Sequence, residues 1–176
     1  MPWVRRILFA FFCVIVFGVL TLFVLGFRAN AGRNHLEIEI NRPAAQVFPW
    51  LLEGSKLKQW VTGLTDVTQL TPGPEQIGTK VRYTVADNGQ KANIDLTITA
   101  FEPNKALGVR VETDAFVNDV HYELSQHDGI TRLESTGVAK YKIWLAKLLE
   151  PLITPDVQKS LQDDAGKLKR LVESQP

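Results

Sequence analysis

The chain has 176 residues, 45% of them hydrophobic, and a formal net charge of +1, which suits a single domain of ordinary size. Removing the four arginines before Asn34 from the twenty basic residues leaves sixteen against nineteen acidic ones, a net charge of −3 that argues against nucleic-acid binding. The single cysteine, Cys13, lies in an apolar run, so disulfides, thiolate catalysis and cysteine-ligated metals are excluded from the rest of the chain.

Residues 7–27 form an uncharged apolar run that reaches roughly 31 Å as a helix, enough to cross the hydrocarbon core of a bilayer. This length favours a retained anchor over a cleavable signal peptide, although Ala29-Asn30-Ala31 matches a signal-peptidase site. Two arginines before the run favour a cytoplasmic N-terminus, and either interpretation places the remaining chain outside the cytoplasm. We therefore predict a single-pass membrane protein, with a transmembrane anchor and linker over residues 1–33 and one extracytoplasmic domain over residues 34–176.

One strand and two short helices are predicted at the start of this domain. Apolar residues alternate with glutamates over residues 35–41, which is typical of a half-buried strand. A helix should follow, with Pro43 in its first turn and a kink at Pro49, because proline lacks a backbone N–H. Gly54 ends this helix, and a second short helical turn runs through Trp60.

Six further segments have strand-like patterns, most with strict alternation of apolar and polar residues. Thr71-Pro72-Gly73-Pro74 and Asp87-Asn88-Gly89 are turn signals between them. Strands this regular, joined by tight turns, indicate an antiparallel meander. The segments cover residues 67–70, 78–85, 93–99, 107–112, 119–124 and 132–137.

The longest amphipathic pattern comes last, from Tyr141 onward. Pro151 and Pro155 interrupt it, and Thr154-Pro155-Asp156 predicts that the helix restarts there. A run of strands closed by a long helix indicates an α+β domain, with one sheet and one helix laid across it. An apolar hollow between sheet and helix is the expected result. The second helical part presents one apolar stripe, made by Val157, Leu161, Ala165, Leu168 and Val172.

The inward strand faces and the helix supply the candidate ligand-lining residues. The alternative is that the same side chains fill an ordinary core, and the two interpretations are evenly balanced for any one residue. Four of them, the tyrosines, the asparagine and the serine, are the stronger candidates, because a buried polar atom needs a partner. The candidates are Tyr83, Leu96, Val109, Asn118, Val120, Tyr122, Leu133, Ser135, Trp144, Leu148 and Leu161.

Recognisable catalytic and metal-binding patterns are missing from the sequence. Asp119, His121 and Glu123 share one strand face, but a solvated strand surface explains them better than a metal site. No nucleophile-elbow sequence surrounds a serine, and no glycine-rich loop suits a phosphate. The sequence therefore predicts no catalytic residue, no metal and no cofactor.

An ordered set of segments resembles the SRPBCC superfamily, also called START-like or Bet v 1-like, and within it the polyketide cyclase/dehydrase-type members. The set runs from Leu36 to Glu173: HLEIEI, RPAAQVFPWLL, KQWVTG, IGTKVRYTV, ITAFEPNKALGVRVE, GITRLESTG and LLEPL…LQDDAGKLKRLVE. The resemblance implies a helix-grip fold, in which a seven-stranded antiparallel sheet wraps around a long C-terminal helix and a hydrophobic cavity. It also places Trp50 and Trp60, beside the short helices, near the cavity mouth, where they would gate entry or touch a bilayer; packing in the core is an equal alternative.

The resemblance implies a protein that binds lipids, sterols, polyketides or other apolar ligands; a minority of members are enzymes. Our first hypothesis is a membrane-tethered, noncatalytic binding protein for a hydrophobic small molecule or lipid. A cyclase- or dehydrase-type enzyme would need an acid or base inside the cavity. The inward strand faces offer no histidine or carboxylate, which counts against an enzyme. A ligand-free interaction module is the third hypothesis, and a filled interior would favour it.

Overall fold

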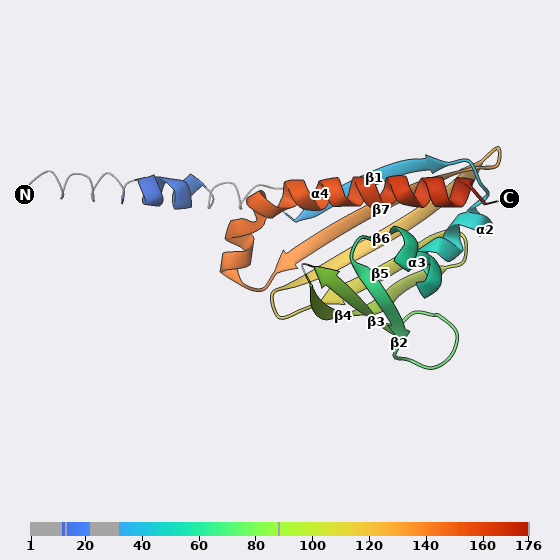
Figure 1. Cartoon of the computed structure of the whole chain (residues 1–176), viewed down its shortest axis with the longest axis horizontal. Helices are drawn as coiled ribbons and strands as arrows, with labels where there is room; N and C mark the ends of the chain where they lie inside the picture. The colour runs from blue at the N-terminus through green and yellow to red at the C-terminus, as the bar shows by residue number, and fades with distance from the viewer. Residues whose placement is uncertain (1–11, 13, 22–31, 88, 176) are drawn as a thin grey trace, which may run out of the picture.

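The computed structural model describes residues 12, 14–21, 32–87 and 89–175, and describes residues 144–154 by their backbone only. One antiparallel sheet and one long helix make up the domain (Figure 1). The seven strands are β1 (Arg33–Ile40), β2 (Leu64–Gln69), β3 (Lys80–Asp87), β4 (Gln90–Glu102), β5 (Ala106–Glu112), β6 (Phe116–His127) and β7 (Ile130–Tyr141). Their order in the sheet is β1-β7-β6-β5-β4-β3-β2.

The sheet is a meander from β2 to β7, and β1 then pairs with β7 at the far edge. All seven predicted strands are present, and β4, β6 and β7 extend to 13, 12 and 12 residues. The register of β4 shifts between Ile98 and Ala100, and such bulges bend a strand. Opposite this bulge, a Cβ on Gly108 would lie 2.8 Å from Thr99 Oγ1 and 2.9 Å from Ala100 Cβ. A glycine is therefore needed where the two bent strands approach most closely.

Three short helical pieces connect β1 to β2: α2 (Ala44–Val47), η1 (Phe48–Leu51) and α3 (Gly54–Trp60). The predicted disturbance at Pro49 is confirmed, because the chain changes there from an α-helix to a 3₁₀-helix. The buried side of these pieces packs against the inner face of the sheet through Phe48, whose ring meets Phe101 edge-on at a centroid distance of 5.9 Å. The short helices thus close one end of the space between the sheet and the last helix.

The last helix, α4, is continuous from Trp144 to Glu173. The predicted interruption at Pro151 and Pro155 is therefore wrong as a break in the helix. Figure 1 shows instead that the first turns of α4 lie at an angle to the rest, which lies across the sheet. A proline removes one hydrogen bond and clashes with the preceding turn, so a long helix can bend at such residues without ending.

The apolar core lies where α4, the short helices and the inner face of the sheet meet. Leu107 of β5 is 2% exposed, and Leu168 and Val172 of α4 are each 1% exposed. Both helix residues lie on the stripe predicted for the second part of α4. The stripe therefore faces the sheet over the end of the helix that is nearer the C-terminus.

The apolar run over residues 7–27 lies largely outside the described residues. Within it, Phe12 and residues 14–21 are helical. No helix among the described residues is long and apolar enough to cross a membrane. The boundary predicted between residues 33 and 34 stays a prediction, with β1 beginning at Arg33.

Candidate functional site

A cavity of about 330 Å³ lies between the inner face of the sheet and α4. Nine of the eleven predicted candidates line it, which places them together; their role as ligand contacts stays a prediction. The side chains of Trp144 and Leu148 lie outside the described part of the structure. The nine are Tyr83, Leu96, Val109, Asn118, Val120, Tyr122, Leu133, Ser135 and Leu161.

The register of the sheet explains why alternation located these residues. Directly opposed residues in antiparallel strands point to the same face. One such row crosses four strands through Leu36, Ser135, Tyr122 and Leu107. All four side chains line the cavity, so a pattern read separately along each strand converges on one wall.

Sequence reasoning missed the contributions of the short helices and one carboxylate on α4. Leu51, Leu57 and Val61 line the cavity from the segment between β1 and β2. Asp164 lines it from α4, so the cavity wall contains a carboxylate although the inward strand faces supply none. A signal for Asp164 was present, because it follows Leu161 by three residues and therefore shares its helix face.

The carboxylate of Asp164 is only 8% exposed and is held by hydrogen bonds. Thr62 donates from its backbone N–H at 3.0 Å and from its hydroxyl at 2.5 Å. Lys167 donates to the same carboxylate at 3.1 Å and to the Thr62 hydroxyl at 2.6 Å. Asp164 therefore ties the loop after α3 to the last helix, and its oxygens are already engaged.

The two cavity tyrosines are neutral under physiological conditions. Burial raises the pKa of Tyr83, and the nearby Tyr122 adds to this rise. Burial also raises the pKa of Tyr122, while a hydrogen bond with Ser135 opposes the rise. Both rings therefore present uncharged hydroxyl groups, and Ser135 already serves as a partner for Tyr122.

Asn118 brings to the cavity wall a polar atom that makes no hydrogen bond with the described residues. Its amide oxygen, Oδ1, is buried and has no hydrogen-bond partner among the described residues. A buried polar atom without a partner costs about 1–3 kcal/mol. A group held in this state at a cavity wall is a candidate to meet a ligand.

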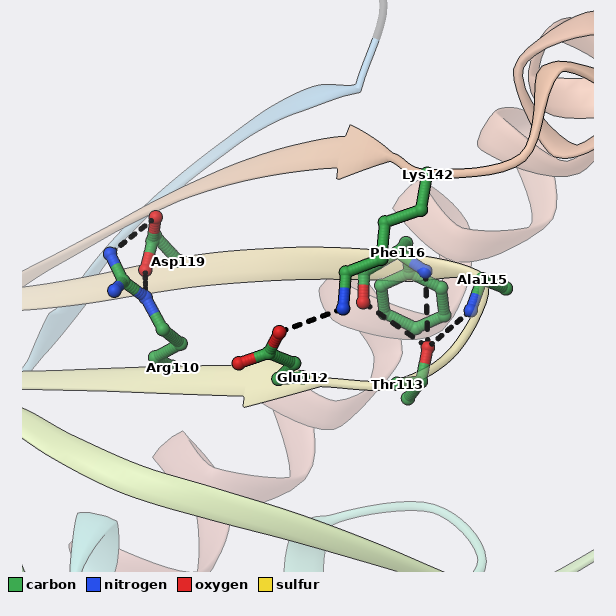
Figure 2. A network of polar contacts seen from close by, with 7 residues as sticks. All are labelled: Arg110, Glu112, Thr113, Ala115, Phe116, Asp119 and Lys142. Atoms are coloured by element: carbon green, nitrogen blue, oxygen red, sulfur yellow. Dashed lines mark hydrogen bonds and ion pairs between the residues drawn. The ribbon is translucent and has the colours of Figure 1, made fainter.

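A second hollow of about 410 Å³, which we call the outer hollow, adjoins the cavity at Phe116 and Asn118. Figure 2 shows the turn that holds Phe116. The Thr113 hydroxyl accepts from the backbone N–H groups of Ala115 at 3.3 Å and Phe116 at 3.1 Å. The backbone N–H of Lys142 donates to the Ala115 carbonyl at 2.8 Å, and its ammonium donates to the Glu112 carboxylate at 2.7 Å. The backbone beside Phe116 is therefore fixed, although its ring lines both spaces.

A further opening of about 200 Å³, which we call the β2–β3 opening, lies beside the short helices. It shares Tyr83, Leu96 and Val109 with the cavity and carries Gln69 and Glu75. The cavity thus adjoins open space on two sides.

Trp50 and Trp60 are both buried, which favours core packing over a place at the cavity mouth. Trp60 is 8% exposed and forms part of the cavity wall, whereas Trp50 is 5% exposed and lies in the core away from the cavity. The indole N–H of Trp60 donates to the Trp50 carbonyl at 2.9 Å. This bond locks the two short helices together, which buries both rings.

The outer face of the sheet is a surface of cross-strand ion pairs. Arg110 contacts Asp119 at 2.6 Å in Figure 2, and this hydrogen bond lowers the pKa of Asp119. His121 lies 3.3 Å from Glu123. In the described part of the chain, no group of three or more histidine, cysteine or acidic residues could hold a metal ion. The polar strand face therefore has the character that the sequence predicts.

Several solved structures have a fold similar to that of this chain. Protein NE0264 from Nitrosomonas europaea matches with a TM-score of 0.68 at 15% identity, covering 83% of this chain and 97% of its own. Protein TTHA0849 from Thermus thermophilus gives a TM-score of 0.64 at 15% identity, covering 80% and 96%. Ara h 8.0201 gives 0.65 at 16% identity, covering 82% and 100%. At these identities the likeness concerns the fold alone.

No curated protein matches the sequence. Residues 33–173 match a family model described as polyketide cyclase / dehydrase and lipid transport. The match spans the sheet and α4, from the first residue of β1 to the last residue of the helix. The predicted SRPBCC resemblance is thereby confirmed, and the chain belongs to the polyketide cyclase/dehydrase and lipid transport family.

Proposed function

We propose that this chain is a membrane-tethered binding protein that holds a hydrophobic small molecule or a lipid in the cavity beneath α4. The observation that carries this proposal is the cavity itself, about 330 Å³ in volume and lined mainly by apolar side chains. Ligand pockets in proteins begin at about this size and combine an apolar wall with a few polar groups. Burial of apolar ligand surface would provide the affinity, at about 25 cal/mol per Å².

An enzyme of the cyclase or dehydrase type is the second candidate, and Asp164 is the observation that favours it. This carboxylate lines the cavity together with Tyr122, so an ionisable group is present there. However, its two oxygens already accept three hydrogen bonds from Thr62 and Lys167, which gives this carboxylate a structural role. We therefore favour binding without chemistry.

The tether is the apolar run over residues 7–27, which is long enough to span a bilayer. We propose that it stays attached, with the domain on the extracytoplasmic side. Full-length protein is then expected to remain in the membrane fraction after an alkaline carbonate wash, at its full mass. A soluble species that begins at Gly32 would contradict the proposal, because it would show cleavage after Ala31.

A bulky side chain inside the cavity is expected to displace the ligand. Val120 lines the cavity from β6, and its neighbour His121 points to the outer face. Val120→Trp should weaken binding of the neutral dye Nile red about tenfold or more. The indole ring would take space that the dye occupies and remove apolar contact worth about 1.5–3 kcal/mol. Dye fluorescence would be measured with the full chain in phosphatidylcholine vesicles, after subtraction of protein-free vesicles.

His121→Trp is the matched control, since it adds the same ring on the other face of the same strand. It should leave dye binding unchanged. The melting temperature of Val120→Trp should also stay close to that of the parent, because the ring occupies empty space. Overpacking a filled core costs about 1–3 kcal/mol. A large drop in melting temperature, with no dye binding in the parent, would show a closed interior and overturn the proposed function.

A further inference from the structure

The outer hollow lies at the end of the sheet where the chain enters the domain. It is bounded by Gly32 before β1, by the turn between β5 and β6, and by Val157 of α4. Figure 1 shows the start of β1 and the β5–β6 turn at the same end of the sheet. The β2–β3 loop, which forms part of the β2–β3 opening, lies toward the other end. The two spaces that adjoin the cavity therefore face different directions.

Gly32 fixes the point at which the tether meets the domain. Its carbonyl accepts from the backbone N–H of Ala139 at 2.6 Å, and its φ of +75° favours glycine. A Cβ at this position would collide with the Ala139 carbonyl oxygen. The apolar run ends at Phe27, five residues earlier, and five extended residues span at most about 18 Å. If the run is a membrane anchor, the outer hollow must lie within about that distance of the bilayer surface.

The residues around the outer hollow suit contact with a bilayer surface. Val157 on its wall is 43% exposed, and Ile143, between β7 and α4, is 45% exposed. Arg33 is an exposed cation on the same wall, and basic groups at a membrane surface are attracted to anionic lipids. The β2–β3 opening carries Glu75 instead. Charge therefore favours the outer hollow as the side that meets lipid.

Asn118 lies where the outer hollow meets the cavity, and its free amide oxygen can only accept a hydrogen bond. A ligand that satisfies it must carry a donor, such as a hydroxyl or an amide N–H. An ionised carboxylate has no donor. The charged side chain among the described residues of the cavity wall is Asp164, which is already paired with Lys167, so the wall offers an anionic headgroup no cation. The site therefore selects against a free fatty acid.

We propose that a neutral amphiphile with a hydroxyl or amide N–H at its polar end enters from the bilayer through the outer hollow, passes the Phe116 ring and rests its donor on Asn118 Oδ1. Its apolar chain then lies in the cavity, toward Tyr122 and Leu107. This inference rests on the proposed function and names the ligand class and the route. The fixed backbone of the β5–β6 turn leaves the Phe116 ring as the movable part of the passage.

The polar contact is tested with three probes that share one chain: 12-bromododecanol, its methyl ether and 12-bromododecanoate. Bromine quenches tryptophan on contact, and Trp60 lies in the cavity wall. Quenching that is lost in the Trp60→Phe variant therefore reports binding in the cavity. The measurement uses the full chain in phosphatidylcholine vesicles. The alcohol should bind more tightly than the ether and the carboxylate. Asn118→Leu should weaken alcohol binding about three- to tenfold, the worth of one hydrogen bond, and leave ether binding unchanged.

The outcomes separate this inference from the proposed function. Quenching by all three probes with equal affinity, or an equal loss for alcohol and ether in Asn118→Leu, would overturn the polar contact while leaving a binding cavity. Absence of cavity quenching by every probe in the parent would overturn both. Unchanged ether binding in Asn118→Leu also shows that the variant is folded.

The proposed entry route is tested by the rates at which the ligand associates and dissociates. Ala115 lines the outer hollow but not the cavity, and Leu52 lines the β2–β3 opening but not the cavity. Ala115→Trp should slow association and dissociation of 12-bromododecanol by the same factor, because it narrows the passage without touching the bound ligand. Leu52→Trp, the matched control, should leave both rates unchanged. Slower exchange in Leu52→Trp alone would overturn the proposed route.

Discussion

Leu168→Ala is expected to lower the free energy of unfolding by about 2–5 kcal/mol. Leu168 is 1% exposed and belongs to the core formed by α4, the short helices and the sheet. It also lines the cavity, so the truncation enlarges a space that neighbouring side chains cannot close. Urea unfolding of the full chain in detergent micelles, followed by near-ultraviolet circular dichroism, would measure the loss.

Leu70→Ala is the control for this truncation, since it removes the same atoms from a side chain that is 41% exposed. Its effect should stay within about 0.5 kcal/mol. A loss below about 1 kcal/mol at Leu168 would contradict the packing of α4 on the sheet, because truncation of a buried leucine lowers the free energy of unfolding by more than this.

The sheet and its inner face could be predicted from the sequence because a strand has a simple period. Side chains alternate between two faces, so Leu96, Val109 and Tyr122 were assigned to the inner face from their own strands alone. The register then brought them together without further information. The family resemblance added the helix-grip arrangement, in which the sheet wraps around the last helix and a cavity.

The contributions of the helices were less accessible to such reasoning. A helix presents a continuous circle of side chains, and its docking angle decides which of them face a cavity. Asp164 was missed because charge suggested solvent exposure, whereas Thr62 and Lys167 supply the partners that allow its burial. The choice between core packing and the cavity mouth for Trp50 and Trp60 could not be made from the sequence, because the bond between them joins residues ten apart in the chain.

The bend in α4 illustrates the same limit. Pro151 and Pro155 were correctly recognised as disturbances, but local sequence does not reveal whether a helix ends or bends at a proline. Contacts elsewhere along the helix decide this, such as those of Ala165, which is 3% exposed. The restart signal at Thr154 lies inside one continuous helix.

Asp164→Ala is expected to lower the free energy of unfolding by about 1.5–3 kcal/mol, the range for hydrogen bonds to a charged group. The substitution removes the acceptor for the Thr62 N–H, the Thr62 hydroxyl and Lys167. The loop after α3 would then lose its attachment to α4. Urea unfolding under the same conditions measures the effect. Asp163→Ala is the matched control, because Asp163 is the neighbouring residue and is exposed. This substitution should change the free energy of unfolding by no more than about 0.5 kcal/mol.

The combination with Thr62→Val separates this clamp from a general effect of losing charge on the helix. Thr62→Val removes the hydroxyl bond to Asp164 and keeps the backbone N–H bond, whereas Asp164→Ala removes both, so the hydroxyl bond is lost in either single variant. The double variant should therefore be more stable than the sum of the single losses predicts, with a coupling of about 0.5–3 kcal/mol. Additive losses would show that the carboxylate acts independently of the Thr62 hydroxyl. In that case this hydroxyl does not commit Asp164 Oδ1 to structure, and the argument against a catalytic role for this residue would be weaker.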